Sequence, residues 1–318
     1  MKTVALAGAT TGFGLTVLDH FLKSSHPYTL VLLTRSPQPQ LSAQGIDVRP
    51  VDYSDHKSLV SALHGVHTIL SFIGGSASAL QNAQLSLLSA AKEAGVTRFA
   101  PSEYAGKGYD GVDLYAGKAI VWDAVRKSGL QYTRFDCGIF MNTFATGTPY
   151  GESEALANLR PWNFVINMKA GTAELPASGD DKIVFTEMND VARFVIASLE
   201  LQIWPGVSGM RGDVKTYREV IAIAERVQRR KFLVREDSVS AMEKQMKEVP
   251  ETSFYNQVRI ALTKGWGLVG DELNKAFPNF ELTGVEEYMS KWWEGVELEE
   301  ASWGSANKTF AFDYRQND

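Results

Sequence analysis

The first 135 residues alternate short apolar runs with amphipathic stretches in which hydrophobic residues recur at helical spacing. Runs such as the one at 28–34 show no polar alternation, which is typical of parallel strands covered on both faces. We expect strands at 3–8, 28–34, 46–52, 67–73, 98–102 and 131–136, and helices near 13–24, 56–64, 79–94 and 115–128. This order predicts an α/β fold built on a doubly wound parallel sheet.

The pattern changes after Asn142, where a stretch rich in Gly, Pro and polar residues begins. It is followed by strand and helix patterns near 181–237 and by a mostly helical segment over 239–318. We expect a nucleotide-binding domain over 1–145 and a smaller, mostly helical substrate-binding region over 146–318, which can be interleaved with the first domain. Core packing is predicted for an apolar stripe at helical spacing: Val285, Met289, Trp292 and Trp293.

A glycine-rich segment, AGATTGFG at 7–14, connects the first predicted strand to the first predicted helix. A pyrophosphate must approach the free N–H groups at a helix N-terminus, and glycines remove the side chains that would block it. Gly8 permits the tight turn, Gly12 lets the phosphates approach, and Gly14 lets the helix lie close to the strand. We expect this loop to bind a dinucleotide through Gly8, Thr10, Thr11, Gly12, Phe13 and Gly14.

The residues that follow the second and fourth strands bear on the choice of nucleotide. The second strand ends in Thr34 and Arg35, where an NAD-specific site would carry an acidic residue. An arginine there can pair with the 2′-phosphate of NADP, so we expect NADP(H); a solvated surface charge is the alternative. The fourth strand leads into Phe72, Ile73 and Gly74, which are expected to line the cofactor at the carboxyl edge of the sheet.

The segment RFAPSEYAGKGYDGVDLYAGKAIVWDAVRKSGLQYTRFDCGIFMN, at 98–142, resembles the isoflavone reductase-like and NmrA-like branch of the atypical short-chain dehydrogenases. The resemblance covers 3–142 well and implies a Rossmann fold and either an NADPH-dependent reductase or an NADP sensor. The residues that carry it are Pro101, Ser102 and Glu103 of a Pro-Ser-Glu-aromatic motif, Tyr104 at the aromatic position, the family lysine Lys118 and the loop aromatic Phe140.

Two positions depart from that branch. Its glycine loop is usually G-x-x-G-x-x-G, whereas here Thr11 replaces the middle glycine and Gly12 follows it. Its reductases often carry an arginine one turn after the lysine, where this chain has Trp122. Phosphate binding is therefore still expected, but its details and the contact made by that arginine can differ.

Lys118 shares one face of its predicted helix with Val121 and Val125, and this face should pack on the sheet. An ammonium group is costly to bury without a partner. When hydride reaches a carbon atom, negative charge develops on an oxygen, and a positioned proton donor stabilises it. We expect Lys118 to be that donor, close to the cofactor; the alternative is a side chain that extends to solvent from the start of the helix.

Tyr115 precedes Lys118 by three residues, one fewer than in the Tyr-x-x-x-Lys pair of short-chain dehydrogenases. In the reductases that the chain resembles, the lysine serves without that tyrosine. We interpret Tyr115 as a wall of the substrate pocket, and its part in proton transfer stays open. The other residues expected in the pocket are Tyr104, Trp122, Gly138 and Phe140.

Composition and charge argue against several classes of function. A net charge of -5 and a pI near 5.7 leave no basic stripe for nucleic acid or an anionic membrane. No apolar run approaches the length of about 18 residues that a membrane span needs, and no histidine pair has metal-ligand spacing. Cys137, the one cysteine, is expected to be a buried hydrophobe in a reducing compartment. We expect a cytoplasmic monomer or homodimer.

Two functions fit these features. The first is an NADPH-dependent reductase of a small aromatic or enone-like metabolite, of phenylpropanoid or aromatic polyketide type, with Lys118 as proton relay. The second is a non-catalytic NADP-sensing regulator that acts through a protein partner, a hypothesis motivated by the missing Tyr-x-x-x-Lys pair. A nucleotide-sugar epimerase or dehydratase is less favoured, because such enzymes are expected to keep the tyrosine.

Overall fold

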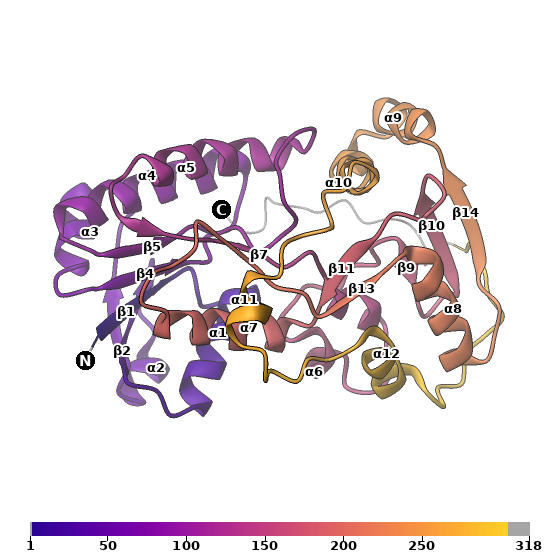
Figure 1. Ribbon diagram of the computed structural model, residues 1–318, viewed down its shortest axis with the longest axis horizontal. Helices are drawn as coiled ribbons and strands as arrows, with labels where there is room; N and C mark the ends of the chain where they lie inside the picture. Colours follow the sequence, from indigo (N-terminus) through magenta and orange to yellow (C-terminus); the bar gives the residue numbers. More distant parts are fainter. Residues whose placement is uncertain (1, 305–318) are drawn as a thin grey trace.

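A parallel sheet forms the amino-terminal half of the protein, whose computed structural model describes residues 2–304 (Figure 1). Its strands are β1 (Lys2–Ala7), β2 (Tyr28–Thr34), β3 (Asp47–Pro50), β4 (Thr68–Ser71), β5 (Arg98–Ala100) and β6 (Gln131–Tyr132). They lie in the order β3-β2-β1-β4-β5-β6, and all neighbours are parallel. The strand order reverses between β1 and β4, so the predicted doubly wound sheet is confirmed.

Helices cover both faces of this sheet. Those from the first half are α1 (Gly12–Lys23), α2 (Pro39–Ala43), α3 (His56–Ala62), α4 (Ala77–Glu93) and α5 (Ala116–Arg126), and α7 (Met188–Ala197) comes from the second half. Figure 1 shows α3, α4 and α5 on one face and α1 and α7 on the other. Alternate residues of β1 serve the two layers, because Leu6 packs with α1 and α7 while Ala7 packs with α3, α4 and α5.

The predicted elements of this half match the observed ones closely, with two differences. Helices α1, α3, α4 and α5 begin and end within two residues of their predicted bounds. The strand predicted at 131–136 is divided at Thr133 into β6 and β7 (Arg134–Asp136), and β7 pairs with β12 (Val207–Gly209). The short helix α2 was not predicted, since its five residues give too little periodicity to detect.

The second half contains two further small sheets. One has the order β13 (Asp213–Lys215), β11 (Ile183–Thr186), β8 (Ile139–Phe140), and the other β14 (Leu233–Asp237), β10 (Thr172–Pro176), β9 (Ile166–Asn167). Its remaining helices are α6 (Glu152–Leu156), α8 (Tyr217–Gln228), α9 (Val239–Glu248), α10 (Ser253–Thr263), α11 (Glu272–Ala276) and α12 (Val285–Trp293). The prediction of a mostly helical region did not include β9 and β10.

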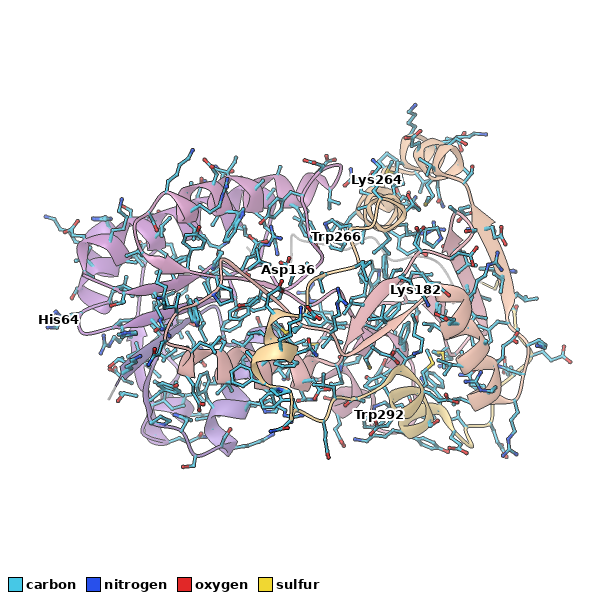
Figure 2. All side chains as sticks on the ribbon, in the orientation of Figure 1. His64, Asp136, Lys182, Lys264, Trp266 and Trp292 are labelled. Atoms are coloured by element: carbon cyan, nitrogen blue, oxygen red, sulfur yellow. The ribbon has the colours of Figure 1, made fainter. Side chains whose placement is uncertain are left out.

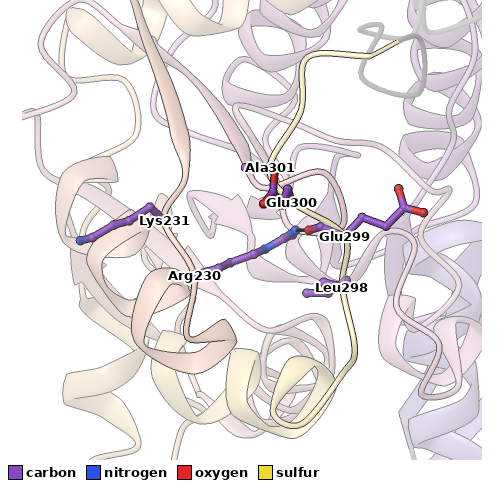
Figure 3. Close-up of a pocket in the computed structure, with 6 residues that line it drawn as sticks. All are labelled: Arg230, Lys231, Leu298, Glu299, Glu300 and Ala301. Carbon is purple, nitrogen blue, oxygen red and sulfur yellow. Dashed lines mark hydrogen bonds between the residues drawn. The ribbon is translucent and has the colours of Figure 1, made fainter.

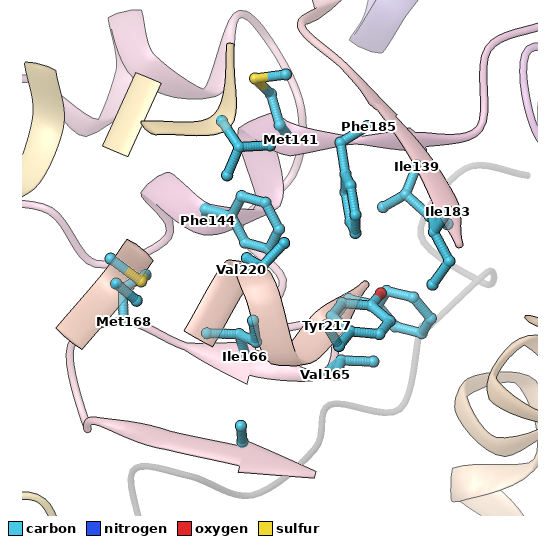
Figure 4. Packing of buried hydrophobic residues seen from close by; sticks show 14 of the residues in the cluster. Ile139, Met141, Phe144, Val165, Ile166, Met168, Ile183, Phe185, Tyr217 and Val220 are labelled. Atoms are coloured by element: carbon cyan, nitrogen blue, oxygen red, sulfur yellow. The ribbon is translucent and has the colours of Figure 1, made fainter. Parts of the chain in front are cut away.

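A separate hydrophobic core holds the second half together (Figure 4). Phe185 is central to it, because its ring lies 5.5 Å from those of Phe144 and Tyr217. The predicted apolar stripe of α12 enters the same core, and its core role is confirmed by the burial of Val285, Met289, Trp292 and Trp293.

Residues of the second half also complete the core of the first sheet. Val191 and Phe194 of α7 belong to the same buried cluster as Leu6 and Leu18. The pairing of β7 with β12 adds a further connection between segments that lie about 70 residues apart in the chain. The region around the carboxyl ends of β4, β5 and β7 is therefore built from both halves.

Three expectations from composition can be compared with the structure. Cys137 is fully buried, which confirms its interpretation as a core residue. No helix within residues 2–304 is both long and apolar enough to cross a bilayer. The same residues contain no group of three or more His, Cys, Asp and Glu side chains placed to share a metal ion.

Candidate functional site

The loop between β1 and α1 lies against the end of β4. Gly8 has a φ of +78°, and a Cβ there would lie 2.9 Å from the nitrogen of Ile73. A Cβ on Gly14 would lie 2.7 Å from the Cα of Ala9. These distances exclude a side chain at either position, because real Cβ contacts are longer. Gly12, by contrast, has a φ of +54° and no atom within 4 Å of its Cβ position, so the loop is open on that side.

The N-terminus of α1 is suited to an anion. Thr11 is the N-cap residue, but its side chain makes no capping hydrogen bond, and the first turn contains no acidic residue. The first N–H groups of the helix and the positive end of its dipole therefore remain available beside the open face of Gly12. Thr10 and Thr11 add hydroxyl groups to the same turn. The residues present thus fit the pyrophosphate of a dinucleotide.

Arg35 and the end of β4 flank this loop. Arg35 is exposed directly after β2, and it forms no hydrogen bond or ion pair within the described chain. Burial raises the pKa of the Tyr53 hydroxyl to about 12, and the positive charge of Arg35 acts to lower it. Gly74 has no atom within 4 Å of its Cβ position. The guanidinium is therefore free to pair with a phosphate.

Four aromatic side chains predicted for the site meet beside the glycine loop. The ring of Phe13 lies 4.8 Å from that of Tyr104 and 5.5 Å from that of Phe140. Phe72 stacks on Tyr104 at 5.2 Å. Tyr104 has a φ of +44° and is buried, so it holds an unusual backbone conformation at the end of β5. The structure thus brings together residues from four separate segments.

Lys118 is buried near the start of α5, with 8% of its surface exposed. Its ammonium group donates a hydrogen bond of 2.7 Å to the backbone carbonyl of Glu103 and lies 5.0 Å from the ring centre of Tyr115. Burial lowers the pKa of Lys118, and the negative charge of Glu103 opposes that change. The alternative in which this side chain extends into solvent is wrong.

Tyr115 lies in the turn before α5 and faces an aromatic wall from the second half. Its ring stacks on Trp266 at 5.8 Å and meets Phe254 edge-on at 6.1 Å. The indole of Trp266 donates a hydrogen bond of 2.7 Å to the carbonyl of Gly108, and its bulk fills the space where Gly106 would carry a Cβ. Trp266 therefore fixes the loop that follows the Pro-Ser-Glu motif, beside Lys118.

A buried ion pair on β7 influences the charge of Lys118. Arg134 donates two hydrogen bonds of 2.7 Å to the carboxylate of Asp136, which is 2% exposed. Both residues lie on β7, and their i, i+2 spacing puts them on one face of the strand. Arg134 also donates to the hydroxyl of Tyr109 at 3.4 Å. Figure 2 shows Asp136 and Trp266 in the middle of the molecule, between its two halves.

Comparison with known proteins places this site in a family. The NmrA-like family model matches residues 1–289. The chain belongs to the NmrA-like family. An oxidoreductase of Botryotinia fuckeliana is 32% identical over 71% of this chain and 76% of its own length. A phenylcoumaran benzylic ether reductase of Nicotiana tabacum is 25% identical over 90% of this chain and 97% of its own.

A solved structure confirms the fold of this NmrA-like protein. The NADPH-dependent quinone oxidoreductase of Escherichia coli, in complex with NADPH, superposes with a TM-score of 0.70. The match covers 91% of this chain and 99% of the other, at 24% identity. The two proteins therefore share the α/β architecture over the matched part of this chain.

Two of the residues predicted for the substrate pocket have mainly structural contacts. Trp122 meets Tyr132 edge-on at 5.4 Å and lies under the guanidinium of Arg134, so it packs against the sheet. Gly138 has a φ of +73°, and a Cβ there would lie 2.2 Å from the carbonyl oxygen of Val184. Their place in a substrate pocket of the NmrA-like protein stays a prediction.

The sequence interpretation missed Trp266, Phe254 and the Arg134–Asp136 pair. The pair left a signal, namely two opposite charges at i, i+2 on either side of Phe135 in a predicted strand, a spacing that puts both side chains on one face. No sequence pattern indicates the role of Trp266, because this residue contacts Tyr115 from a position about 150 residues further along the chain. Glu103 was noted as part of a motif, but no role was assigned to its carboxyl group.

A hollow elsewhere on the surface has a structural explanation (Figure 3). It lies between the α8–β14 connection and residues 298–301. Arg230 crosses it and donates hydrogen bonds to the carbonyls of Met168 at 2.6 Å, Lys169 at 2.9 Å and Glu299 at 2.5 Å. This guanidinium joins its own segment to the backbone at 168–169 and at 299, so it is not available to a ligand.

Proposed function

We propose that this NmrA-like protein is an NADPH-dependent reductase of a small aromatic or enone-like metabolite, with Lys118 as the proton donor. One observation carries the proposal: the ammonium of Lys118 is buried and fixed by the Glu103 carbonyl. Burying an ammonium group costs free energy of folding, and a protein that only binds nucleotide has no need for such a group at this position. The relatives named as oxidoreductases and reductases support the same class of activity.

The cofactor would be held by the backbone at Gly8–Gly14 and by the free guanidinium of Arg35. The open face of Gly12 and the uncapped start of α1 suit the pyrophosphate, and Arg35 suits the 2′-phosphate that distinguishes NADPH from NADH. When bound, NADPH supplies the hydride. The protein's own contribution is to bind and orient both reactants and to hold a proton close to the substrate oxygen.

Lys118 would supply that proton. The developing negative charge on the substrate oxygen is stabilised by an ammonium group in a site that excludes water, and proton transfer from Nζ completes the reduction. Because burial lowers the pKa of Lys118, its proton is given up more readily than that of a solvated lysine. The backbone carbonyl of Glu103 accepts a hydrogen bond from Nζ at 2.7 Å and so orients it. Because this carbonyl is neutral, it does not form an ion pair with the ammonium group.

The aromatic wall favours a planar substrate. Tyr115, Phe254 and Trp266 present rings beside Lys118, and rings of this kind bind flat aromatic molecules by stacking. The relative from Nicotiana tabacum is named as a reductase of phenylcoumaran benzylic ethers. We therefore infer that the substrate is an aromatic ketone, an enone or a benzylic ether, of phenylpropanoid or aromatic polyketide origin.

The test is turnover of NADPH by the purified protein with a panel of aromatic ketones, enones and benzylic ethers. We expect consumption of NADPH with at least one substrate, with one molecule of reduced product formed for each NADPH oxidised. NADPH binding without turnover on the whole panel, together with recovery of a specific protein partner, would instead support an NADP-sensing regulator. The readout is product identity by mass spectrometry together with the absorbance of the reduced nicotinamide.

A further inference from the structure

Glu103 has a carboxyl group that the proposed reduction does not yet use. The residue is 6% exposed, and its backbone carbonyl is the acceptor that holds Lys118. Its Oε1 atom is fully buried and has no hydrogen-bond partner among residues 2–304. A buried carboxyl oxygen without a partner is costly in the ionised form, so this group is best accommodated when it carries a proton.

We propose that the carboxyl group of Glu103 stores the proton that recharges Lys118 after each reduction, an inference that rests on the function proposed above. Lys118 passes its proton to the substrate oxygen and is left as a neutral amine. Glu103 then turns its carboxyl group toward that amine, with which it forms no hydrogen bond or ion pair in the structure, and transfers its own proton to it. This restores the ammonium and leaves a carboxylate. Water returns one proton to the carboxylate, so each cycle takes up one proton with the hydride.

The need for a store follows from the burial of Lys118. With 8% of its surface exposed, the amine has little direct access to water, and a substrate lying against it would reduce that access further. The carboxyl group can be reached from the side of Tyr109, which borders Glu103 and is only partly buried. The hydroxyl group of Tyr109 accepts from Arg134 at 3.4 Å. Protons can therefore reach Glu103 from the Tyr109 side while the substrate covers Lys118.

The neighbouring groups are less suited to this task. The groups that face Glu103 or Lys118 are Tyr109, Tyr115, Arg134, Asp136 and Cys137. Burial raises the pKa of Asp136 and Arg134 acts to lower it, but both carboxyl oxygens of Asp136 already accept hydrogen bonds from that guanidinium, so this group is engaged elsewhere. Burial raises the pKa of the Tyr109 and Tyr115 hydroxyls and of the Cys137 thiol, so none of the three readily gives up a proton of its own.

The shifts in pKa act in the direction that the transfer requires. Burial raises the pKa of Glu103 to about 7, although Lys118 and Arg134 act to lower it. Burial lowers the pKa of Lys118. The two values thus approach each other, and proton transfer between the groups becomes easier than between a solvated glutamate and a solvated lysine. Below about pH 7 the carboxyl group of Glu103 carries its proton, and it loses that proton as the pH rises through that value.

The test is a rapid-mixing measurement on Glu103→Gln, which keeps the size and the backbone carbonyl of residue 103 but removes its titratable proton. At about pH 6, with saturating NADPH and an accepted substrate, Lys118 starts charged in both proteins. We expect the first turnover of the variant to stay within about threefold of the wild type, and later turnovers to be at least about tenfold slower. The wild type should show no such slowing between the first and later turnovers.

Glu187→Gln is the matched control. Glu187 is equally buried and its pKa is also raised by burial, but it caps α7 and is bound by Asn142, away from Lys118. This variant should give the wild-type pattern. If all turnovers of Glu103→Gln are equally slow, Glu103 only holds Lys118 in place, and if none is slow, no store is needed; either result overturns the proposal.

A second measurement needs no variant. In the wild type, kcat should fall as the pH rises through about 7, and at about pH 8.5 the first turnover should outrun the later ones because Glu103 starts without its proton. The same pattern at both pH values would overturn the proposal.

A separate result bears on the function itself. Wild-type turnover by Lys118→Met would remove Lys118 as the donor, whereas a slow Lys118→Met with an unchanged Glu103→Gln removes only the role of Glu103.

Discussion

The glycine loop and the surroundings of Lys118 are built in opposite ways. In the loop, the important contacts are made by backbone atoms of neighbouring segments, and side chains must be absent at Gly8 and Gly14. Around Lys118, side chains from distant segments make the contacts: Lys118 of α5 donates to the Glu103 carbonyl, and Tyr115, just before α5, stacks on Trp266 from the region after α10. The loop therefore depends on the absence of side chains at two positions, whereas the surroundings of Lys118 depend on side chains brought together from distant segments.

This difference predicts how each region responds to change. A substitution in the loop acts through steric exclusion, so its effect should depend on the direction in which the new side chain points. A substitution near Lys118 acts through charge or stacking, so its effect should appear in the rate or in substrate binding while NADPH binding remains. Variants of both kinds can therefore separate binding of the cofactor from reduction of the substrate.

The largest effect is expected for Gly14→Val. Its Cβ would lie 2.7 Å from the Cα of Ala9, which cannot move without displacing the loop, so NADPH binding and folding should both be lost. Gly95→Ala is the matched control, because Gly95 lies between α4 and β5, outside the glycine loop, its Cβ points into open space, and it costs only about 1 kcal/mol for the φ of +75°. Thermal unfolding and NADPH titration measure both. Equal losses in the two variants would contradict the steric account.

Arg35→Glu should have the next largest effect, on the choice of nucleotide. Losing the charged hydrogen bond to the 2′-phosphate and adding repulsion should weaken NADPH binding roughly 100-fold, with little change for NADH. Titration of each nucleotide, followed by quenching of the protein's tryptophan fluorescence, measures the two affinities. Equal losses for both nucleotides would show that Arg35 does not contact the phosphate.

Trp266→Leu should act on the substrate. Loss of the stack on Tyr115 and of the hydrogen bond to Gly108 should raise KM for an aromatic substrate about tenfold and leave the affinity for NADPH unchanged. Trp303→Leu is the control, because Trp303 is 41% exposed and contacts Arg235. Steady-state kinetics with varied substrate would refute the wall assignment if both variants kept the wild-type KM.

The smallest effect is expected for Tyr115→Phe. The ring that contacts Lys118 and Trp266 is kept, and only the hydroxyl group is removed. If Tyr115 is a wall of the pocket, kcat should change by less than about threefold; a proton donor would lose about 100-fold or more. The ratio of kcat between the variant and the wild type therefore settles the role that the sequence left open.

Sequence reasoning located the sheet, its helices and the glycine loop because these depend on local patterns. The sequence of β1, the turn at Gly8 and the start of α1 are contiguous, so one short segment specifies the cradle. It also singled out Lys118, since a charge on an apolar helix face stands out in the pattern.

The rest of the site depends on tertiary contacts that no local pattern contains. Trp266 is placed beside Tyr115 by the packing of the second half on the first, and the helical period around it gives no sign of that contact. The free carboxyl oxygen of Glu103 likewise becomes apparent only when the burial and partners of each atom are known. The division of the chain at residue 145 stays a prediction, as does the expected cytoplasmic location.

The central claim is that the buried ammonium of Lys118 gives the proton in reduction. The most direct test is the single-turnover rate of NADPH oxidation by Lys118→Met at saturating NADPH, with Lys127→Met on the exposed end of the same helix as control. We predict a rate about 100 to 10,000 times lower for Lys118→Met and a rate within about twofold of the wild type for Lys127→Met. A wild-type rate for Lys118→Met with an accepted substrate would contradict the account.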